Sequence, residues 1–260
     1  MAAALATAYQ PPDEDPEGSS NGSMPFLAHL DELRKRIVCS CVAIGAGAVV
    51  AFLFVDRIFH FVFAPAMRML PAGSRLIYTQ PGEAFSLYID LALIAGSLLA
   101  APFVMYQLWM FVAPGLYARE KRLAIPFVLL TTMGAIAGAA FSHYILFPSM
   151  IAFFGTFSST DLEFFPRIAD VFDLYMKMLV GMVAVFQIPT VVFFLARMRL
   201  VTARFLWAQI KYAILLIFIV AAVLTPSGDP WNQTVFAAPM VVLYLLSIVI
   251  AWAVAPRAPR

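Results

Sequence analysis

Long apolar runs alternate with short polar segments along most of the chain. A helix that crosses about 30 Å of hydrocarbon needs roughly 20 apolar residues, because each residue adds about 1.5 Å. Four runs reach that length, at residues 37–55, 84–112, 123–147 and 171–196, and two more follow at 212–225 and 234–254. Turn-forming residues at 226–233 separate the last two runs. The pattern predicts an all-α integral membrane protein with six transmembrane helices.

The run at 212–225 is the shortest of the six. As a helix, its roughly 14 residues span only about 21 Å, which is less than the thickness of the hydrocarbon core. We therefore expect this helix either to thin the bilayer locally or to pack against protein.

The composition also indicates a membrane protein and excludes most water-soluble classes. Of the 260 residues, 63% are hydrophobic and 12% are charged, too few polar side chains to cover a water-facing surface. Residues 1–23 hold four acids and few apolar side chains, which predicts a disordered cytoplasmic tail. Residues 24–254 are the predicted membrane domain, and 255–260 a short second tail. Cys39 and Cys41 are expected to be buried as small apolar side chains, with neither a disulfide nor a metal site.

The basic residues near the ends of the apolar runs predict the orientation, because Lys and Arg resist translocation. Twelve share one side: Arg34, Lys35, Arg36, Arg119, Lys121, Arg122, Arg197, Arg199, Arg204, Lys211, Arg257 and Arg260. Four lie on the other side, Arg57, Arg68, Arg75 and Arg167, and Lys177 lies inside a run. The asymmetry places both termini in the cytoplasm and requires an even number of crossings. Nucleic acid is not an expected partner of this charge distribution.

The two longer outer loops carry aromatic and proline residues among few charges. Residues 56–82 and 148–170 both show this composition, which favours short helices lying at the membrane interface.

Catalytic and cofactor-binding patterns are missing from the sequence. The apolar runs hold no Ser/His or Asp/Asp pair in a recognisable spacing, and the chain has no phosphate-binding glycine loop and no helical His-x-x-x-His pair. An enzyme is therefore the least supported class, and neither a cofactor nor a metal is expected.

The segment before the first run, residues 29–36, places two acids directly before three bases. In a helix, Glu32 and Arg36 are four residues apart and can form an ion pair. Alternatively, Glu32 presents its carboxylate at the membrane surface, where the guanidinium group of a ligand can bind both oxygens. The residues alone leave both interpretations open.

The loop after the second run repeats this arrangement, with Glu120 as the only acid among Arg119, Lys121 and Arg122. Pro114 and Gly115 are expected to break the helix just before it. The carboxylate of Glu120 either neutralises its basic neighbours or, with Glu32, holds two adjacent cations.

Three segments together closely resemble the TatC family, the multi-spanning receptor subunit of the twin-arginine protein translocase. They are Phe26–Arg36, the stretch from Ala101-Pro to Glu120, and the stretch from Leu224-Thr-Pro to Pro239-Met240. The resemblance covers about residues 24–254. It implies six helices forming a concave, glove-like wall, with cytoplasmic termini and with short fifth and sixth helices.

The resemblance also implies the function and its partners. Members bind twin-arginine signal peptides of folded proteins and support their protonmotive-force-driven export with TatA-type and TatB-type single-span proteins. They also associate with one another in the receptor complex. The location implied is the bacterial plasma (inner) membrane.

Site residues follow from the same resemblance. For signal-peptide binding they are Glu32, Glu120, Leu33, Arg34 and Phe111. Other positions that the family needs for function match Pro65, Phe85 and Asp229. The helix at 212–225 matches the docking surface for partner helices.

Gln187 departs from the family pattern, because many relatives carry a glutamate there. A neutral amide costs less to bury than a carboxylate and cannot ionise. We expect Gln187 to hydrogen-bond the polar tip of a partner helix, and we do not expect a protonatable group at this position.

Two other functions compete with this one. A secondary transporter of a small solute would also use six helices, but its two halves should show matching broken helices around a midplane site. That pattern is not evident in the sequence. An intramembrane enzyme would need the catalytic pair that is missing.

Overall fold

The structure is a computed structural model that describes residues 26–70, 76–112, 124–159, 164–225 and 228–254. Within these residues all regular secondary structure is helical, apart from one isolated parallel bridge between Ile77 and Arg167. The helices are α1 (Phe26–Phe52), α2 (Val55–Met69), α3 (Glu83–Val112), α4 (Ala124–Phe141), α5 (Phe147–Gly155), α6 (Ile168–Val185), α7 (Ile188–Arg197), α8 (Ala203–Ala208), α9 (Ile210–Leu224) and α10 (Pro230–Val254). A π-helical turn, Ser142–Leu146, joins α4 to α5.

Five helical stretches are long and apolar enough to cross a membrane: His29–Phe52, Glu83–Phe111, Ile125–Gly155, Ile168–Arg197 and Pro230–Val254. All five coincide with predicted runs, although the third continues past residue 147 through the π-helical turn into α5. The remaining run forms the shorter apolar helix Ile210–Leu224, which has 15 residues. The expectation of a short sixth helix is wrong, because α10 has 25 residues and begins at Pro230, before the apolar run.

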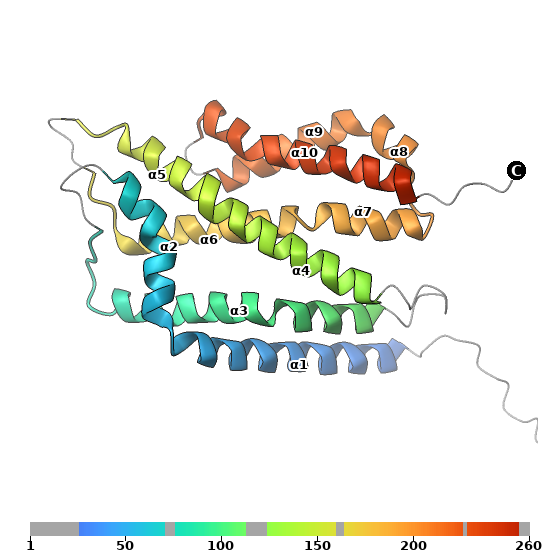
Figure 1. The fold of residues 1–260 in the computed structure, drawn as a ribbon, viewed down its shortest axis with the longest axis horizontal. Helices are drawn as coiled ribbons and strands as arrows, with labels where there is room; N and C mark the ends of the chain where they lie inside the picture. The colour runs from blue at the N-terminus through green and yellow to red at the C-terminus, as the bar shows by residue number, and fades with distance from the viewer. Residues whose placement is uncertain (1–25, 71–75, 113–123, 160–163, 226–227, 255–260) are drawn as a thin grey trace, which may run out of the picture.

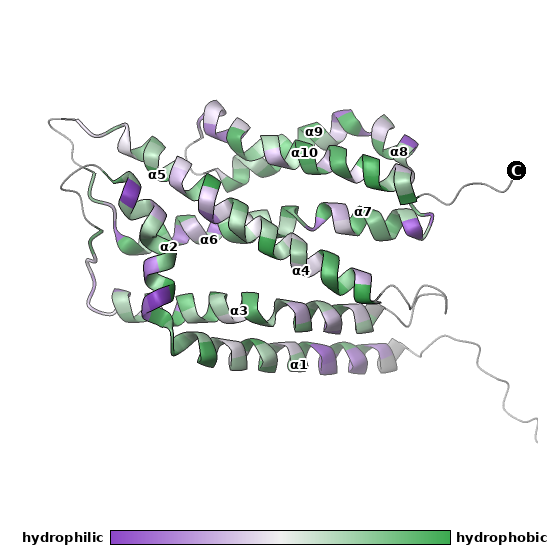
Figure 2. Ribbon diagram, viewed as in Figure 1, coloured by the Kyte–Doolittle hydropathy of each residue, from purple (hydrophilic) through white to green (hydrophobic). Residues whose placement is uncertain are grey.

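The long helices run back and forth between two ends of the molecule (Figure 1). At one end, here called the α1 end, α1 begins, α3 stops, α4 starts, α7 leads into α8, and α10 finishes. At the other, the α2 end, lie α2, α5 and the starts of α3, α6 and α10. Hydrophilic residues gather at the start of α1, on α2 and around α8, whereas the helices between are mostly hydrophobic (Figure 2). This distribution suits a lipid-embedded middle with two polar ends.

Two glycines allow α1 and α3 to pack backbone against backbone. A Cβ atom added at Gly96 would lie 2.2 Å from the backbone nitrogen of Ala48, and one added at Gly47 would lie 2.6 Å from the carbonyl oxygen of Gly96. Small residues at a helix contact permit this approach in membranes, where van der Waals packing replaces the hydrophobic effect between helices. Gly47 and Gly96 therefore fix how the antiparallel helices α1 and α3 are aligned along each other.

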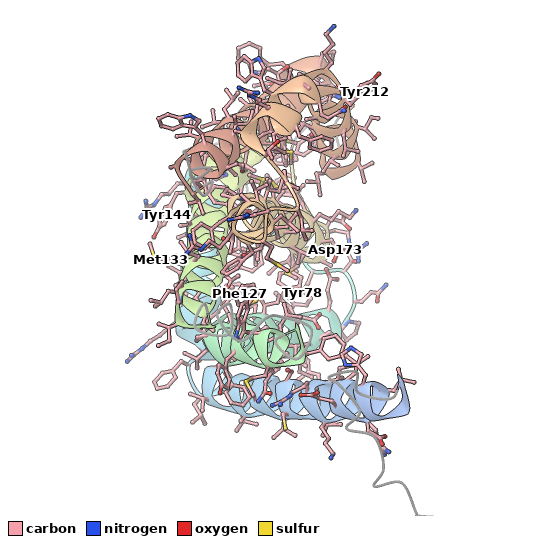
Figure 3. The ribbon with its side chains drawn as sticks, turned by 90° about the vertical axis from the view of Figure 1, so that its right-hand side faces the viewer. Tyr78, Phe127, Met133, Tyr144, Asp173 and Tyr212 are labelled. Carbon is pink, nitrogen blue, oxygen red and sulfur yellow. The ribbon has the colours of Figure 1, made fainter. Side chains whose placement is uncertain are left out.

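The helix α4 packs on α6 by the same device. Cβ atoms at Gly134 and Gly138 would meet the carbonyl oxygens of Phe186 at 2.9 Å and Met182 at 2.8 Å. As a result α4 crosses α3 and α6 obliquely on one face of the molecule (Figure 1). Met133 and Tyr144 project from that face, while Asp173 and Tyr212 lie on the opposite side (Figure 3).

The helix α2 fulfils the prediction of a helix in the first outer loop. It crosses one end of the molecule and buries Phe63 and Ala66 completely against its neighbours. Phe61 stacks on His143 of the π-helical turn, with ring centroids 4.3 Å apart. Its position at a membrane interface stays a prediction. The second outer segment instead extends the third crossing as α5.

The two cysteines correct a burial expectation. Cys39 and Cys41 are free and exposed on α1. Apolar side chains that face lipid look the same in the sequence as those that face protein, because both surroundings are nonpolar.

Glu83 fastens the loop before α3 to the start of α6. Its carboxylate accepts hydrogen bonds from the backbone N–H groups of Thr79 at 3.0 Å and Ala169 at 3.2 Å, and it lies 3.5 Å from the guanidinium of Arg167. Beside it, the N–H of Ile168 donates to the carbonyl of Ile77 at 2.8 Å. With its side chain 7% exposed, Glu83 is the shared acceptor that connects the two segments.

Glu83→Ala is therefore expected to lower the Tm of the purified protein in detergent by several degrees, because backbone donors lose their acceptor. Asp170→Asn is the matched control. Asp170 is exposed in the same region and makes no side-chain hydrogen bond or ion pair with another described residue. An equal Tm for the two variants would show that the junction contributes nothing to stability.

Candidate functional site

At the α1 end, a chain of polar side chains connects α1 to α3. Glu32 and Arg36 form the i,i+4 ion pair, with Oε1 and Nη2 3.0 Å apart. The other terminal nitrogen of Arg36, Nη1, donates to Oε1 of Gln107 at 3.1 Å. The glycine contact farther along the pair sets the register that brings Gln107 opposite Arg36. One guanidinium therefore bridges a carboxylate on its own helix and an amide on the next.

A ring stack extends this contact toward the start of α1. His29 and Phe111 lie face to face, with centroids 4.5 Å apart and an interplanar angle of 20°. Phe111 is therefore held over the first turns of α1, one helical turn away from Gln107.

Leu33, Arg36 and Phe111 line a groove of about 270 Å³ between α1 and α3. Val104 and Met105 line this groove and also a larger one of about 560 Å³, so the two adjoin. The larger groove lies between α1, α3 and α6, and its lining is apolar apart from Ser97 and Gln187. Two adjoining grooves, both mostly apolar, therefore lie beside the Glu32–Arg36 pair.

The Glu32–Arg36 pair is only partly withdrawn from solvent. Their side chains are 19% and 27% exposed, respectively. Among the described residues, Glu32 accepts a bond at one oxygen only, from Arg36. An ionised carboxylate has two oxygens and about four acceptor positions, so this site retains capacity for a further cationic donor.

The other predicted binding residues at this end are less fully defined. Leu33 and Phe111 are partly buried in the small groove, whereas Arg34 is exposed. Glu120 lies outside the described residues, and its pairing with Glu32 stays a prediction.

Three predicted positions lie at the opposite end of the molecule. Pro65 is inside α2, Phe85 is 67% exposed near the start of α3, and Asp229 precedes α10. Asp229 caps α10, because its Oδ2 accepts from the backbone N–H of Asn232 at 3.0 Å. The structure therefore does not gather the predicted residues into one site.

Gln187 lies between the two ends, where α6 gives way to α7. Its Nε2 donates to the backbone carbonyl of Thr131 in α4 at 3.1 Å, and its Oε1 is buried without a partner among the described residues. The amide group thus ties the helix break to α4. Its predicted contact with a partner helix stays untested, and in this conformation one N–H of the amide is already used within the chain.

Sequence reasoning missed Gln107 and the aromatic contacts near it. Trp109, Phe127 and Phe194 form a triangle with centroids 5.0 to 5.5 Å apart, which joins α3, α4 and α7 behind the site. A polar Gln107 in an apolar run was the one available signal, since an intramembrane polar residue usually has a partner. Among the described residues, no group of three His, Cys, Asp or Glu side chains could hold a metal ion.

Comparison with known proteins shows which family shares these features. Residues 28–239 match the family described as "Sec-independent protein translocase protein (TatC)". The chain is 41% identical over 242 residues to the protein of that name from Koribacter versatilis, covering 91% of this chain and 88% of the relative. It is 37% identical over 232 residues to the one from Helicobacter pylori, covering 89% and 90%.

Two solved structures have the same fold. The crystal structure of the twin-arginine translocase receptor TatC superposes with a TM-score of 0.73 at 30% identity, covering 86% of this chain and 97% of that one. A second crystal structure of that receptor, in DDM, gives 0.74 at 28% identity, with 86% and 99% covered. The chain belongs to the TatC family of Sec-independent protein translocase proteins.

Proposed function

We propose that this protein is the receptor subunit of a twin-arginine translocase. It binds the twin-arginine signal peptides of folded proteins and, with TatA-type and TatB-type partners, supports their export by the protonmotive force. The paired arginines bind at Glu32 and Glu120, and the apolar stretch of the signal enters the adjoining grooves. Membership of this family makes a small-solute transporter the less favoured hypothesis for the function.

One observation carries the proposal: a carboxylate lies beside the first of two adjoining, mostly apolar grooves. Glu32 is joined through Arg36 to the small groove, and that groove leads into the larger one at Val104 and Met105. A ligand with cations at one end and an apolar segment behind them matches this arrangement, in which the Glu32 carboxylate is followed by two apolar grooves. Leu33 and Phe111 then contact the ligand between its charged and apolar parts.

The charge chemistry favours arginine over lysine. A guanidinium offers two parallel N–H groups to the two oxygens of a carboxylate, whereas an ammonium is a compact point charge. Hydrogen bonds to charged groups contribute about 1.5–3 kcal/mol each. Two such contacts are therefore enough to separate an Arg-Arg signal from a Lys-Lys one.

The charge distribution supports a binding site on the cytoplasmic side of the membrane, and the membrane we propose is the bacterial plasma membrane. Among the described residues, seven Lys and Arg side chains lie at the α1 end: Arg34, Lys35, Arg36, Arg197, Arg199, Arg204 and Lys211. Three lie toward the α2 end: Arg57, Arg68 and Arg167. By the positive-inside rule, the α1 end, where α1 begins and α10 finishes, faces the cytoplasm.

The helix α9 is the proposed docking surface for the partner helices. The proposed concave wall consists of six crossings: α1, α3, α4 with α5, α6 with α7, α9 and α10. Along α9, four side chains between 52% and 79% exposed offer an apolar face: Leu215, Leu216, Ile219 and Val223. On its other side, Ala221 is fully buried. A short helix with one free apolar face is suited to receive a single-span helix in the membrane.

The decisive test compares two peptides on the purified full chain in lipid nanodiscs. One carries Arg-Arg before an apolar stretch, and the other carries Lys-Lys at the same positions. We expect fluorescence anisotropy to show Arg-Arg binding and at least about tenfold weaker Lys-Lys binding. Equal affinities, or no binding of either peptide, would overturn the proposed function.

A further inference from the structure

The proposed ligand-binding carboxylate already has one cationic partner in this structure. Nη2 of Arg36 lies 3.0 Å from Oε1 of Glu32, while Nη1 of the same group donates to Gln107 at 3.1 Å. The occupant is a guanidinium, the same chemical group that the proposed ligand presents. Any ligand arginine that binds Glu32 must therefore share it with Arg36 or displace it.

We propose that Arg36 is an internal stand-in for the ligand's arginine, and that the incoming arginine displaces it from Glu32. This inference rests on the proposed function and names the residue that sets the site's affinity. In the empty receptor Arg36 keeps the carboxylate paired. On binding, the ligand's guanidinium takes over Glu32 and Arg36 withdraws.

The geometry fits displacement in three respects. Arg36 contacts Glu32 through one nitrogen and one oxygen, whereas a free guanidinium can contact both oxygens at once. Both side chains are partly exposed, so a ligand reaches the pair without opening the helix contact. The contact with Gln107 gives the released guanidinium an acceptor that does not depend on Glu32.

Displacement of a like group lowers the affinity of the site. The apparent affinity is the intrinsic affinity multiplied by the fraction of receptors in which Arg36 has released Glu32, so the ligand is held less tightly than by a free carboxylate. This factor is the same for an arginine and for a lysine ligand, because Arg36 must leave Glu32 before either binds. The preference for arginine therefore comes from the bidentate fit at Glu32, and Arg36 sets the affinity alone.

The test measures the Kd of the Arg-Arg peptide for full-length Arg36→Gln protein in nanodiscs. The expected result is binding about three- to tenfold tighter than wild type, as removal of a competitor occupying most of the receptors requires. Lys35→Gln is the matched control, because it removes the same charge one residue away. Lys35 is exposed and has no ion-pair partner among the described residues. Its Kd should stay within about twofold of wild type.

Two further variants complete the design. In an Arg36→Gln, Glu32→Gln double variant the gain should vanish, because no carboxylate is left to release. Arg36→Lys keeps the charge but cannot span Glu32 and Gln107 together, so its Kd should fall between wild type and Arg36→Gln. If Arg36→Gln does not fold, the Kd of the Arg-Arg peptide for Arg36→Lys tests the stand-in role instead.

The outcomes separate this inference from the proposed function. Unchanged or weaker binding by both Arg36 variants, with Glu32-dependent wild-type binding intact, overturns the stand-in role alone. An equal gain in Lys35→Gln also overturns it, since the effect would then be general electrostatics. Wild-type protein that ignores the Arg-Arg peptide contradicts the proposed function itself.

Discussion

Glu32→Gln is expected to weaken binding of an Arg-Arg signal peptide by about 10- to 100-fold, with the protein still folded in the membrane. The substitution keeps the size of the side chain and removes its charge, so it costs a charge-assisted bond worth about 1.5–3 kcal/mol. Part of this loss is offset. In the wild type the peptide must displace Arg36, which contacts Glu32 at 3.0 Å, whereas in the variant this ion pair no longer has to be broken. The Kd measured in nanodiscs reports the net effect.

Asp31→Asn is the control for that experiment. Asp31 is the neighbouring acid, is exposed, and makes no side-chain hydrogen bond or ion pair with another described residue. Removing its charge should change the Kd by no more than about twofold, because exposed charges are well screened. If Asp31→Asn weakens binding as much as Glu32→Gln, a diffuse acidic surface and not a carboxylate site attracts the peptide.

Gly96→Ala is expected to destabilise the protein by at least about 3 kcal/mol, at the upper end of the cost of overpacking. Its new Cβ would lie 2.2 Å from the backbone nitrogen of Ala48, and a backbone atom cannot move aside as a side chain can. The helices α1 and α3 would have to separate, which also breaks the Arg36–Gln107 contact. A lower Tm in detergent and a reduced amount of protein in the membrane are the readouts.

Gly45→Ala is the matched control on α1. A Cβ atom at Gly45 meets nothing within 4 Å, and alanine favours a helix over glycine by up to about 1 kcal/mol. This variant should be as stable as wild type or slightly more so. Should Gly96→Ala keep the wild-type Tm, the close approach of the two helices is not what holds them together.

The crossings could be predicted from sequence because lipid imposes a single length requirement. The five long helices and the 15-residue α9 coincide with the apolar runs. The helix in the first outer loop was also predictable, since aromatic residues and few charges mark α2. The length of α10 was not, because its first turns carry the polar residues of the connector, where Asp229 caps the helix.

Contacts between helices were beyond sequence reasoning, because in lipid a buried and an exposed apolar residue look alike. Cys39 and Cys41 show this, since they are exposed where burial was expected. The Glu83 junction joins residues 84 apart in sequence, and Arg36 and Gln107 are 71 apart. Only the local pair of Glu32 and Arg36 was within reach, because helical spacing alone places them together.

For the candidate site, the local interpretation and the ligand interpretation of Glu32 are compatible. The i,i+4 pair exists, and it leaves one carboxylate oxygen without a bond to another described residue. Pro65, Phe85 and Asp229 lie at the other end of the molecule, so any part they play in function is exerted away from the arginine-binding residues. Resemblance supplied those positions, and no local chemistry in the sequence pointed to them.

The central claim is that the carboxylate of Glu32 meets a guanidinium of the ligand, and a double-mutant cycle tests it directly. The cycle combines Glu32→Gln with a peptide in which citrulline, a neutral isostere, replaces one arginine. We predict that citrulline weakens binding to wild type by at least about tenfold but to Glu32→Gln by less than about twofold, for whichever arginine faces Glu32. Equal losses in both proteins, for each arginine in turn, would show no coupling and contradict the account.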